Sequence, residues 1–113
     1  MENKFVEFDD FQKLDIRAGT IIRIESFPEA LNSSYKIYVD FGDLGMRKTS
    51  AQITANYKID ELLGEQIIGV LNLKEKIIAG FKSEFLLLGV NDSEGEVVIL
   101  TPERFVKEGA KVY

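Results

Sequence analysis

The chain has 113 residues, of which 45% are hydrophobic, and it carries a formal net charge of −5. This length is near the commonest size of a compact domain and is sufficient to bury a hydrophobic core. Because the chain contains no cysteine and no histidine, disulfides, Ser-His or Cys-His catalysis and imidazole metal sites are excluded. No apolar run approaches the roughly 20 residues of a membrane span, and the acidic N-terminus does not resemble a signal peptide. We expect a cytoplasmic protein without a metal or cofactor.

The middle of the chain is its least acidic part. Residues 33–82 carry seven cations and six anions, whereas residues 1–32 carry four and seven and residues 83–113 carry three and six. An acidic protein binds nucleic acid only through a localised cationic patch. The middle third is therefore the place to look for one.

Apolar side chains recur every three residues before the first predicted strand, at Phe5, Phe8, Phe11 and Leu14. Asp9 or Asp10 can cap a short helix that carries the last two of these residues. The aromatic side chains either pack against the end of the core or form a subunit interface, where aromatic residues are enriched. The sequence leaves both alternatives open.

Residues 15–27 alternate as a long strand that ends at Pro28. Gly19 lies inside it and is typical of a bulge or a sharp bend. A long, bent first strand that serves two sheets is what a small barrel requires. The alternation predicts that the outer face of this strand carries Arg17, Ile21, Arg23 and Glu25. It predicts that the inner face carries Ile16, Ala18, Thr20, Ile22 and Ile24.

A hairpin is predicted over residues 34–54, with its turn at residues 42–45, where glycine accepts positive φ at little cost. Alternation gives the hairpin one core face and one outer face. The core face comprises Tyr35, Ile37, Val39, Phe41, Ala51 and Ile53. The outer face comprises Lys36, Tyr38, Lys48, Ser50 and Gln52.

The remaining segments are shorter. A helix is expected over residues 55–64 with Gly64 as its stop, and a strand buried on both faces over residues 66–73. Residues 74–80 suggest a mixed-charge turn region. Two more strands, 85–90 and 96–100, flank a turn at 91–95, and the apolar residues of the tail indicate that it packs on the domain.

This order of elements predicts an all-β protein, a five-stranded OB-fold Greek-key barrel with short flanking helices. We expect one domain over residues 1–113, with a helical segment at 1–14, the barrel at 15–100 and the tail at 101–113. A generic small β-barrel or sandwich is the alternative.

An OB-fold offers oligonucleotides the face of its second and third strands. On that face Lys36 and Lys48 would meet phosphates, Tyr38 would stack on a base, and Ser50 and Gln52 would hydrogen-bond base edges. The alternative is a solvated strand face with ordinary cross-strand pairs. No catalytic residue is assigned, although carboxylate chemistry stays open. Residues 42–45 lack the remainder of a phosphate loop.

A series of short motifs resembles the tRNA-binding domain family. The motifs follow in the family's order and cover nearly the whole chain: Asp15-Ile16-Arg17-Ala18-Gly19, Phe27-Pro28-Glu29-Ala30, Tyr35-Lys36, Val39-Asp40-Phe41-Gly42, Ser50-Ala51-Gln52-Ile53-Thr54, Leu63-Gly64, Asn72 and residues 78–84. Within the family the chain is most similar to the free-standing CsaA branch, which is described as export-related chaperones. Other relatives are appended to methionyl- and phenylalanyl-tRNA synthetases.

The resemblance implies a homodimeric, non-catalytic OB-fold protein that binds tRNA by shape rather than by sequence. By position it implies an RNA-facing set of Lys36, Arg47, Lys48, Ser50, Gln52, Lys76, Lys82, Ser83 and Glu84. The CsaA branch is also credited with holding unfolded or precursor polypeptides. That alternative function would use an apolar groove lined by Phe81, Phe85 and the N-terminal phenylalanines.

Two departures from the family pattern weaken the tRNA interpretation and are compatible with the alternative. Family members carry a Pro-Arg-Arg or Pro-Arg-Lys run where this chain has Glu75-Lys76-Ile77, and each lost phosphate contact lowers affinity and its salt dependence. The synthetase-appended domains read Ser-x-Gly-Met where this chain has residues 83–86, Ser-Glu-Phe-Leu. Both changes make the 74–86 region more apolar.

Overall fold

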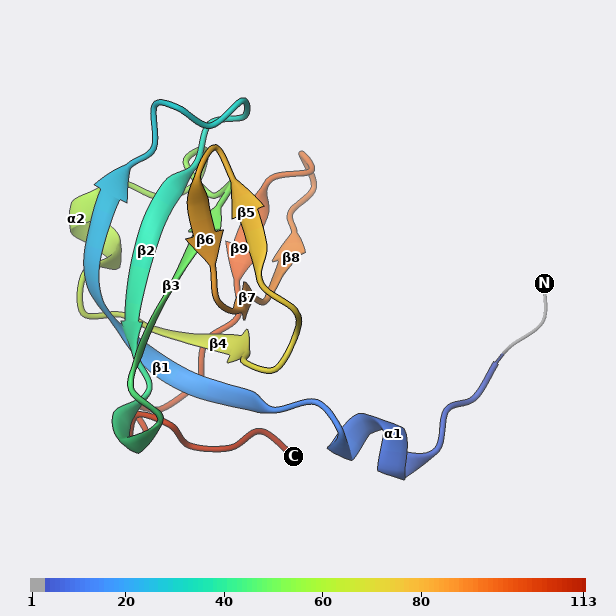
Figure 1. The fold of residues 1–113 in the computed structure, drawn as a ribbon. Coiled ribbons are helices and arrows are strands. Elements are labelled where there is room, and N and C mark those ends of the chain that lie inside the picture. Colours follow the sequence, from blue (N-terminus) through green and yellow to red (C-terminus); the bar gives the residue numbers. More distant parts are fainter. Residues whose placement is uncertain (1–3) are drawn as a thin grey trace.

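The computed structural model describes residues 4–113 (Figure 1). This part of the chain has two short helices, α1 (Phe8–Gln12) and α2 (Ile59–Leu62), and a 3-10 turn, η1 (Gly42–Leu44). None of its helices is long and apolar enough to cross a lipid bilayer. The strands are β1 (Ile16–Ser26), β2 (Tyr35–Asp40), β3 (Met46–Ala51), β4 (Gln66–Val70), β5 (Lys76–Ile78), β6 (Phe81–Ser83), β7 (Leu86–Leu87), β8 (Gly89–Asn91) and β9 (Val97–Ile99).

The central sheet is antiparallel, with the strand order β3-β2-β1-β4-β7. Strand β1 curves so that its first half pairs with β4 and its second half with β2 (Figure 1). The sheet nearly closes on itself, because the backbone N–H of Glu84 donates to the Lys48 carbonyl over 2.8 Å and the Thr49 hydroxyl donates to the Phe85 carbonyl over 2.8 Å. With α2 between β3 and β4, this is the expected all-β, OB-fold-like barrel.

The expected side of two residues in β1 is wrong. Ile21 is 1% exposed and Ile22 is 51% exposed, the reverse of the prediction. A β-bulge between Ile21 and Arg23 interrupts the alternation at Ile21 and Ile22. Beyond the bulge Arg23 is exposed and Ile24 packs against the core cluster, as predicted. Gly19 is not at the bulge. A Cβ there would lie 2.5 Å from the Val39 side chain, so glycine is required because the core packs directly against this backbone.

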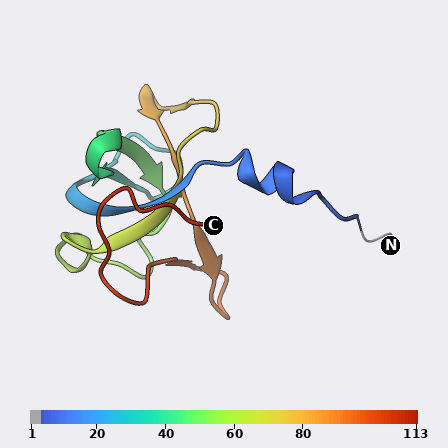
Figure 2. The ribbon, with the colours of Figure 1, turned by 90° about the horizontal axis from the view of Figure 1, so that it is seen from below.

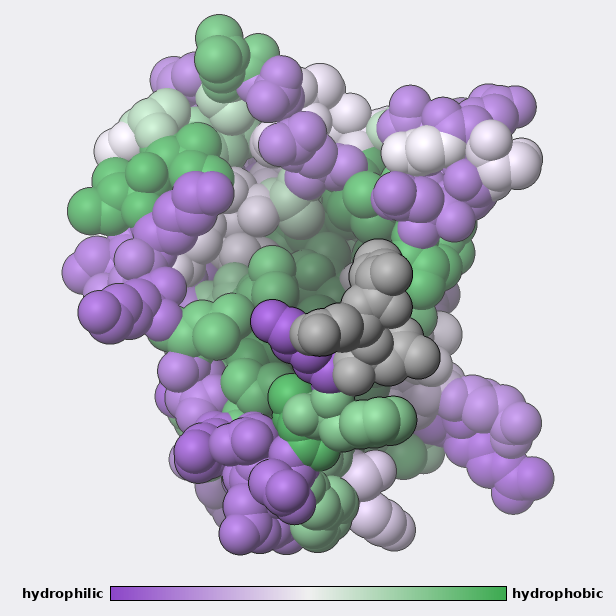
Figure 3. Space-filling model, turned by 90° about the vertical axis from the view of Figure 1, so that its right-hand side faces the viewer, coloured by the Kyte–Doolittle hydropathy of each residue, from purple (hydrophilic) through white to green (hydrophobic). Residues whose placement is uncertain are grey.

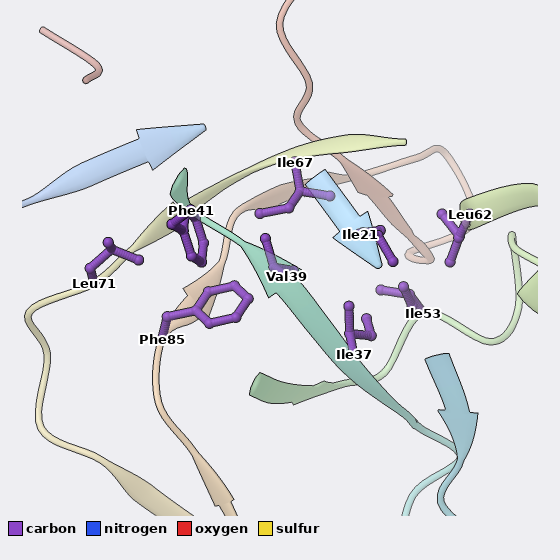
Figure 4. Packing of buried hydrophobic residues seen from close by; sticks show 9 residues of the cluster. All are labelled: Ile21, Ile37, Val39, Phe41, Ile53, Leu62, Ile67, Leu71 and Phe85. Carbon is purple, nitrogen blue, oxygen red and sulfur yellow. The ribbon is translucent and has the colours of Figure 1, made fainter. Parts of the chain in front are cut away.

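The core faces of β1, β2 and β4 meet inside the barrel (Figure 4). Ile37, Val39 and Phe41 are fully buried, as the alternation of the hairpin predicts. Phe85 packs edge-to-face on Phe41 with ring centroids 5.1 Å apart. Ile53 is buried beside them, while Tyr35 and Ala51 are half-buried against the same cluster. The predicted core face of the hairpin is therefore confirmed.

Residues 74–83 contain a hairpin where only a turn region was predicted. Strands β5 and β6 pair with Ile78 opposite Phe81, which leaves a two-residue loop. Its residues, Ala79 and Gly80, have φ of 46° and 79°, as a type I′ turn requires. Alanine rarely adopts positive φ, so the sequence carries only half of the usual signal for this turn.

Two other predicted elements are shorter than expected. Helix α2 covers four residues of the predicted ten-residue segment, and Gly64 follows it with φ of 87°, so the predicted stop is confirmed. The strand predicted over residues 85–90 is divided into β7, which pairs with β4, and β8, which pairs with β9. One apolar run thus serves two sheets.

The N-terminal segment extends away from the barrel (Figure 2). Phe5, Phe8 and Phe11 are 94%, 66% and 36% exposed, so the alternative in which they pack against the end of the core is wrong. Asn72 fixes the point where the segment leaves: its side chain accepts from the Asp15 N–H over 2.8 Å and donates to a Lys13 carbonyl over 2.6 Å. The segment has a defined origin but exposes its aromatic side chains.

The C-terminal tail packs on the domain, as predicted, and it does so along β1. The Ala18 N–H donates to the Ala110 carbonyl over 2.9 Å, and the Val112 N–H donates to the Ile16 carbonyl over 2.8 Å. Buried Gln66 holds the tail further upstream, because its amide exchanges two hydrogen bonds with the backbone of Val106. The tail therefore covers the edge of β1 that β2 has left.

Candidate nucleic-acid interface

The outer face of the β2–β3 hairpin is assembled by its register. Lys36 lies opposite Ser50 and Tyr38 lies opposite Lys48, and because side chains alternate along a strand these four share one face. Strand β6 runs beside β3 and adds Phe81 from a third strand. The predicted outer face is thus the surface of three strands rather than two.

Aromatic rings lie beneath the lysines of this face. The ring centroids of Phe27 and Phe81 are 5.5 Å apart, and those of Tyr38 and Phe81 are 6.3 Å apart, both edge-to-face. The Lys36 ammonium lies 4.8 Å from the Phe27 centroid and 5.2 Å from that of Phe81. The Lys48 ammonium lies 4.9 Å from the Phe81 centroid. We call these five residues the aromatic-backed face.

Tyr38 is held by two charged neighbours. Its hydroxyl donates to Glu25 over 3.1 Å, and the Arg23 guanidinium lies 5.1 Å from its ring centroid. Burial, and then the Glu25 carboxylate, raise the pKa of Tyr38, so its hydroxyl stays protonated at neutral pH. A hydrogen bond from Arg23 lowers the pKa of Glu25. A base that stacks on Tyr38 would therefore meet a ring that Arg23 already covers on one side.

Arg23 is a candidate that the sequence reasoning did not single out. The alternation of the first strand predicted that the Arg23 side chain lies on the outer face. Nothing in the local sequence connected this side chain with Tyr38. The connection arises because the bulge shifts the pairing so that Arg23 lies opposite Tyr38 on β2. Its charge is matched by Glu25, with which it forms an ion pair.

The predicted cations differ in what compensates their charge. Within residues 4–113, neither the Lys36 ammonium nor the Lys48 ammonium has a carboxylate oxygen within 4.0 Å. Lys82 lies 3.6 Å from Glu75, and the guanidinium of Arg47 donates to the Leu71 carbonyl over 2.9 Å. The aromatic-backed lysines therefore form no ion pair within 4.0 Å, although Lys36 lies opposite Glu25 on β1 and its charge adds to the effect of Arg23 in lowering the pKa of that carboxyl. Arg47 and Lys82 are tied to neighbours.

The predicted polar residues of the face mainly connect β3 to β6. The Ser50 N–H donates to the Ser83 hydroxyl over 3.1 Å, and the two hydroxyls lie 3.2 Å apart. The Glu84 carboxylate accepts from the Lys48 N–H over 3.1 Å. Gln52 stays exposed. Three of the four polar groups are thus used within the protein.

A pocket of about 640 Å³ adjoins this face. Its rim includes Ser50, Gln52, Lys76 and Ser83, and its apolar walls include Ile78, Phe85, Leu86, Leu87 and Val97. Figure 3 shows that hydrophobic side chains gather in a hollow on this side of the molecule. Phe81 and the N-terminal phenylalanines are not among the described residues that line it. Of the predicted groove residues, the pocket therefore contains Phe85 alone.

The barrel and its outer face define the chain as an OB-fold domain with a pair of half-buried cations backed by aromatic rings. A family model described as "Putative tRNA binding domain" matches residues 16–111. The chain belongs to this tRNA-binding domain family, as its motifs predicted. The family is a tRNA-binding domain rather than a catalytic one.

Solved structures of CsaA chaperones are similar over nearly the whole chain. The protein from Bacillus anthracis has 43% identity and a TM-score of 0.92, and the match covers 97% of this chain and 100% of that protein. The protein from Picrophilus torridus has 44% identity and a TM-score of 0.90, with 96% and 100% covered. The predicted similarity to the CsaA branch is confirmed.

Methionine–tRNA ligases are similar over a small part of their length. The enzyme from Pyrococcus abyssi is 42% identical over 108 residues, which are 96% of this chain and 14% of that enzyme. A structure of a MetRS related protein from Pyrococcus horikoshii has 27% identity and a TM-score of 0.87. It covers 98% of this chain and is itself covered completely.

Proposed function

We propose that the chain binds tRNA without catalysing a reaction, and that it does so in the cytoplasm through the aromatic-backed face and its surroundings. The observation that carries this proposal is that Lys36 and Lys48 share one face without an ion pair within 4.0 Å, on a protein with a net charge of −5. Phosphate contacts supply most of the affinity of sequence-independent nucleic-acid binding. Half-buried lysines on an OB-fold face are suited to make them.

Recognition by shape and backbone fits the state of the polar residues. Ser50 and Ser83 bond each other and Glu84 bonds the β3 backbone, so few free donors or acceptors remain to read base edges. Lysine contacts position an RNA but carry no sequence information. We infer that the face reads the course of the phosphate backbone.

We further propose that the protein acts as a homodimer through its N-terminal segment. Its exposed apolar side chains are Phe5, Val6, Phe8, Phe11 and Leu14. Aromatic residues at an interface core bury large areas, and a second copy of the chain would cover them. Two modest cationic faces reach useful affinity when both engage one RNA.

A titration with total tRNA at two salt concentrations tests the proposed function. Binding should weaken steeply with added salt, because counterions released from the RNA drive it. The double variant Lys48→Glu with Lys76→Glu should abolish binding while the circular dichroism spectrum stays unchanged. Arg104→Glu with Lys107→Glu changes the net charge equally in the exposed tail, and this control should bind far better than the first variant. Absence of tRNA binding even at low salt contradicts the proposal.

A second candidate function, binding of unfolded or precursor polypeptides, is favoured by the apolar pocket beside the face. Such binding should change little with salt, because it depends on apolar surface. Leu86 is 48% exposed on the pocket wall, and Leu86→Asp should weaken binding of a reduced, unfolded test protein. If that test protein binds the wild type and the variant equally, this candidate fails.

A further inference from the structure

We propose that Phe81 is a positioning residue of the RNA-binding face: its ring holds Lys36 and Lys48 together as a clamp for one stretch of phosphate backbone. The inference rests on the proposed function for its ligand. It assigns Phe81 to the RNA face rather than to a polypeptide groove.

The lysines come from different strands but converge on one ring. Lys36 lies on β2 and Lys48 on β3, diagonal to one another in the register, and Phe81 is the first residue of β6. Their ammonium groups lie 5.2 Å and 4.9 Å from its centroid. Both distances are within the range of a cation–π interaction.

The ring itself is fixed. Phe81 is 9% exposed, and the edge of one ring meets the face of another at both Phe27 and Tyr38. The type I′ turn immediately before it sets the start of β6. A ring that packs against two other rings keeps its position, so the position of the ring restrains the lysine side chains.

A ring restrains a lysine in a way that a carboxylate cannot. A free lysine side chain has large rotamer entropy that binding must remove. An aromatic face attracts the ammonium while leaving its full charge available for a phosphate. A carboxylate also restrains it but cancels the charge, as Glu75 does for Lys82 at 3.6 Å. The aromatic rings therefore restrain the two lysines without an ion pair within 4.0 Å.

A measurement without RNA tests the geometry directly. Protons above an aromatic ring are shifted upfield by its ring current, so the ε-methylene protons of Lys36 and Lys48 should resonate upfield of those of Lys58. In Phe81→Leu the shift should vanish for Lys48 and decrease for Lys36, whose ammonium also lies 4.8 Å from the Phe27 centroid. Both shifts should persist in Phe81→Tyr. Wild-type ε-methylene signals at the same position as that of Lys58 would overturn the proposal, whatever the variants do.

Binding measurements then test the positioning role. Phe81→Leu should weaken tRNA binding about fivefold, without changing the slope of affinity against salt, because both lysines still reach phosphates. Lys36→Ala should lower that slope by about one. Phe81→Tyr should bind tRNA with wild-type affinity, because it keeps an aromatic ring beneath the lysines. If Phe81 only filled space in the core, this difference between the tyrosine and leucine variants would not be expected.

Phe41→Leu is the matched control, since Phe41 is a fully buried ring of the core cluster. It should lower thermal stability at least as much as Phe81→Leu while leaving tRNA affinity near the wild-type value. Equal affinity of Phe81→Leu and wild type would overturn the positioning role and leave the proposed function intact. Absence of tRNA binding by the wild type would overturn the proposed function, whereas the ring-current shift would still decide the arrangement of the lysines.

Discussion

The chain places phenylalanines in two contrasting environments. Phe27 and Phe81 lie beneath the lysines of the barrel face and are 4% and 9% exposed. Phe5 and Phe8, in the N-terminal segment, are 94% and 66% exposed. The same residue type therefore occurs as buried rings beneath the lysines and as exposed rings in the N-terminal segment.

The difference shows how one kind of side chain serves two purposes. A buried ring that meets cations keeps their charge exposed and fixes where it lies. An exposed ring instead keeps apolar surface in contact with water, and burying that surface against another molecule is favourable. We therefore expect the first set to govern the folded barrel and its RNA contacts, and the second to govern association between copies.

The largest expected effect separates the two sets by stability. Phe27→Ala should lower the free energy of unfolding by about 3–5 kcal/mol, because it removes a buried ring and leaves a cavity. Phe8→Ala should change it by less than about 0.5 kcal/mol, when both are measured by urea denaturation at a dilution that keeps the chain monomeric. Equal losses would show that the segment packs on the barrel after all.

The next effect concerns association. Phe8→Asp with Phe11→Asp should convert a dimer into a monomer in sedimentation, and should weaken tRNA binding about 100-fold because bivalency is lost. Leu63→Asp with Phe105→Asp is a matched control, since these residues are 57% and 72% exposed elsewhere. A control that also dissociates the protein, or a first variant that stays dimeric, would contradict this assignment.

A smaller effect compares a lysine that forms an ion pair with two lysines that form none within 4.0 Å. Lys36→Ala with Lys48→Ala should weaken tRNA binding roughly 10- to 30-fold and should lower the salt slope by about two. Lys82→Ala should cost about twofold, because Lys82 is half-exposed and already faces Glu75. Fluorescence anisotropy with labelled tRNA over a range of salt measures both. Equal losses per lysine would remove the distinction.

The smallest expected effect is an increase in tRNA affinity rather than a loss. Glu25→Gln should strengthen tRNA binding about threefold, because it releases the charge of Arg23 and removes an anion beside the face. Unchanged or weaker binding in the same assay would show that Arg23 does not contribute to the face.

The same variant should also change the pH dependence of stability. The bond from Arg23 lowers the folded-state pKa of Glu25 below its ordinary value of 4.5. The stabilisation is therefore present above pH 4.5 and is lost as the pH falls through the lower folded value. Glu25→Gln should flatten the acid side of the stability profile, measured as the urea midpoint against pH.

Local patterns were sufficient for the barrel's interior. The period of two in residues 35–41 placed Ile37, Val39 and Phe41 in the core, because successive side chains of a strand point to opposite faces. Gly64 predicted the end of α2, since a left-handed residue closes a helix. Ordered motifs predicted the family. Each of these signals resides in neighbouring residues and needs no knowledge of distant ones.

Alternation failed where a distant strand decided the outcome. The bulge at Ile22 depends on pairing between β1 and β2, and the β5–β6 hairpin depends on Ala79 accepting an unusual φ of 46°. The bare phenylalanines were also undecided, because spacing alone does not say whether a core has room for them.

The outer face divides between the two sources of information. The sequence by itself placed Lys36, Tyr38 and Lys48 on one side of a hairpin, through a period that strand geometry imposes. Only the tertiary structure brought Phe81 beneath both lysines and set Glu75 against Lys82. The physical reason is that charge compensation and cation–π contact depend on distances between separate strands, which the closure of the barrel determines.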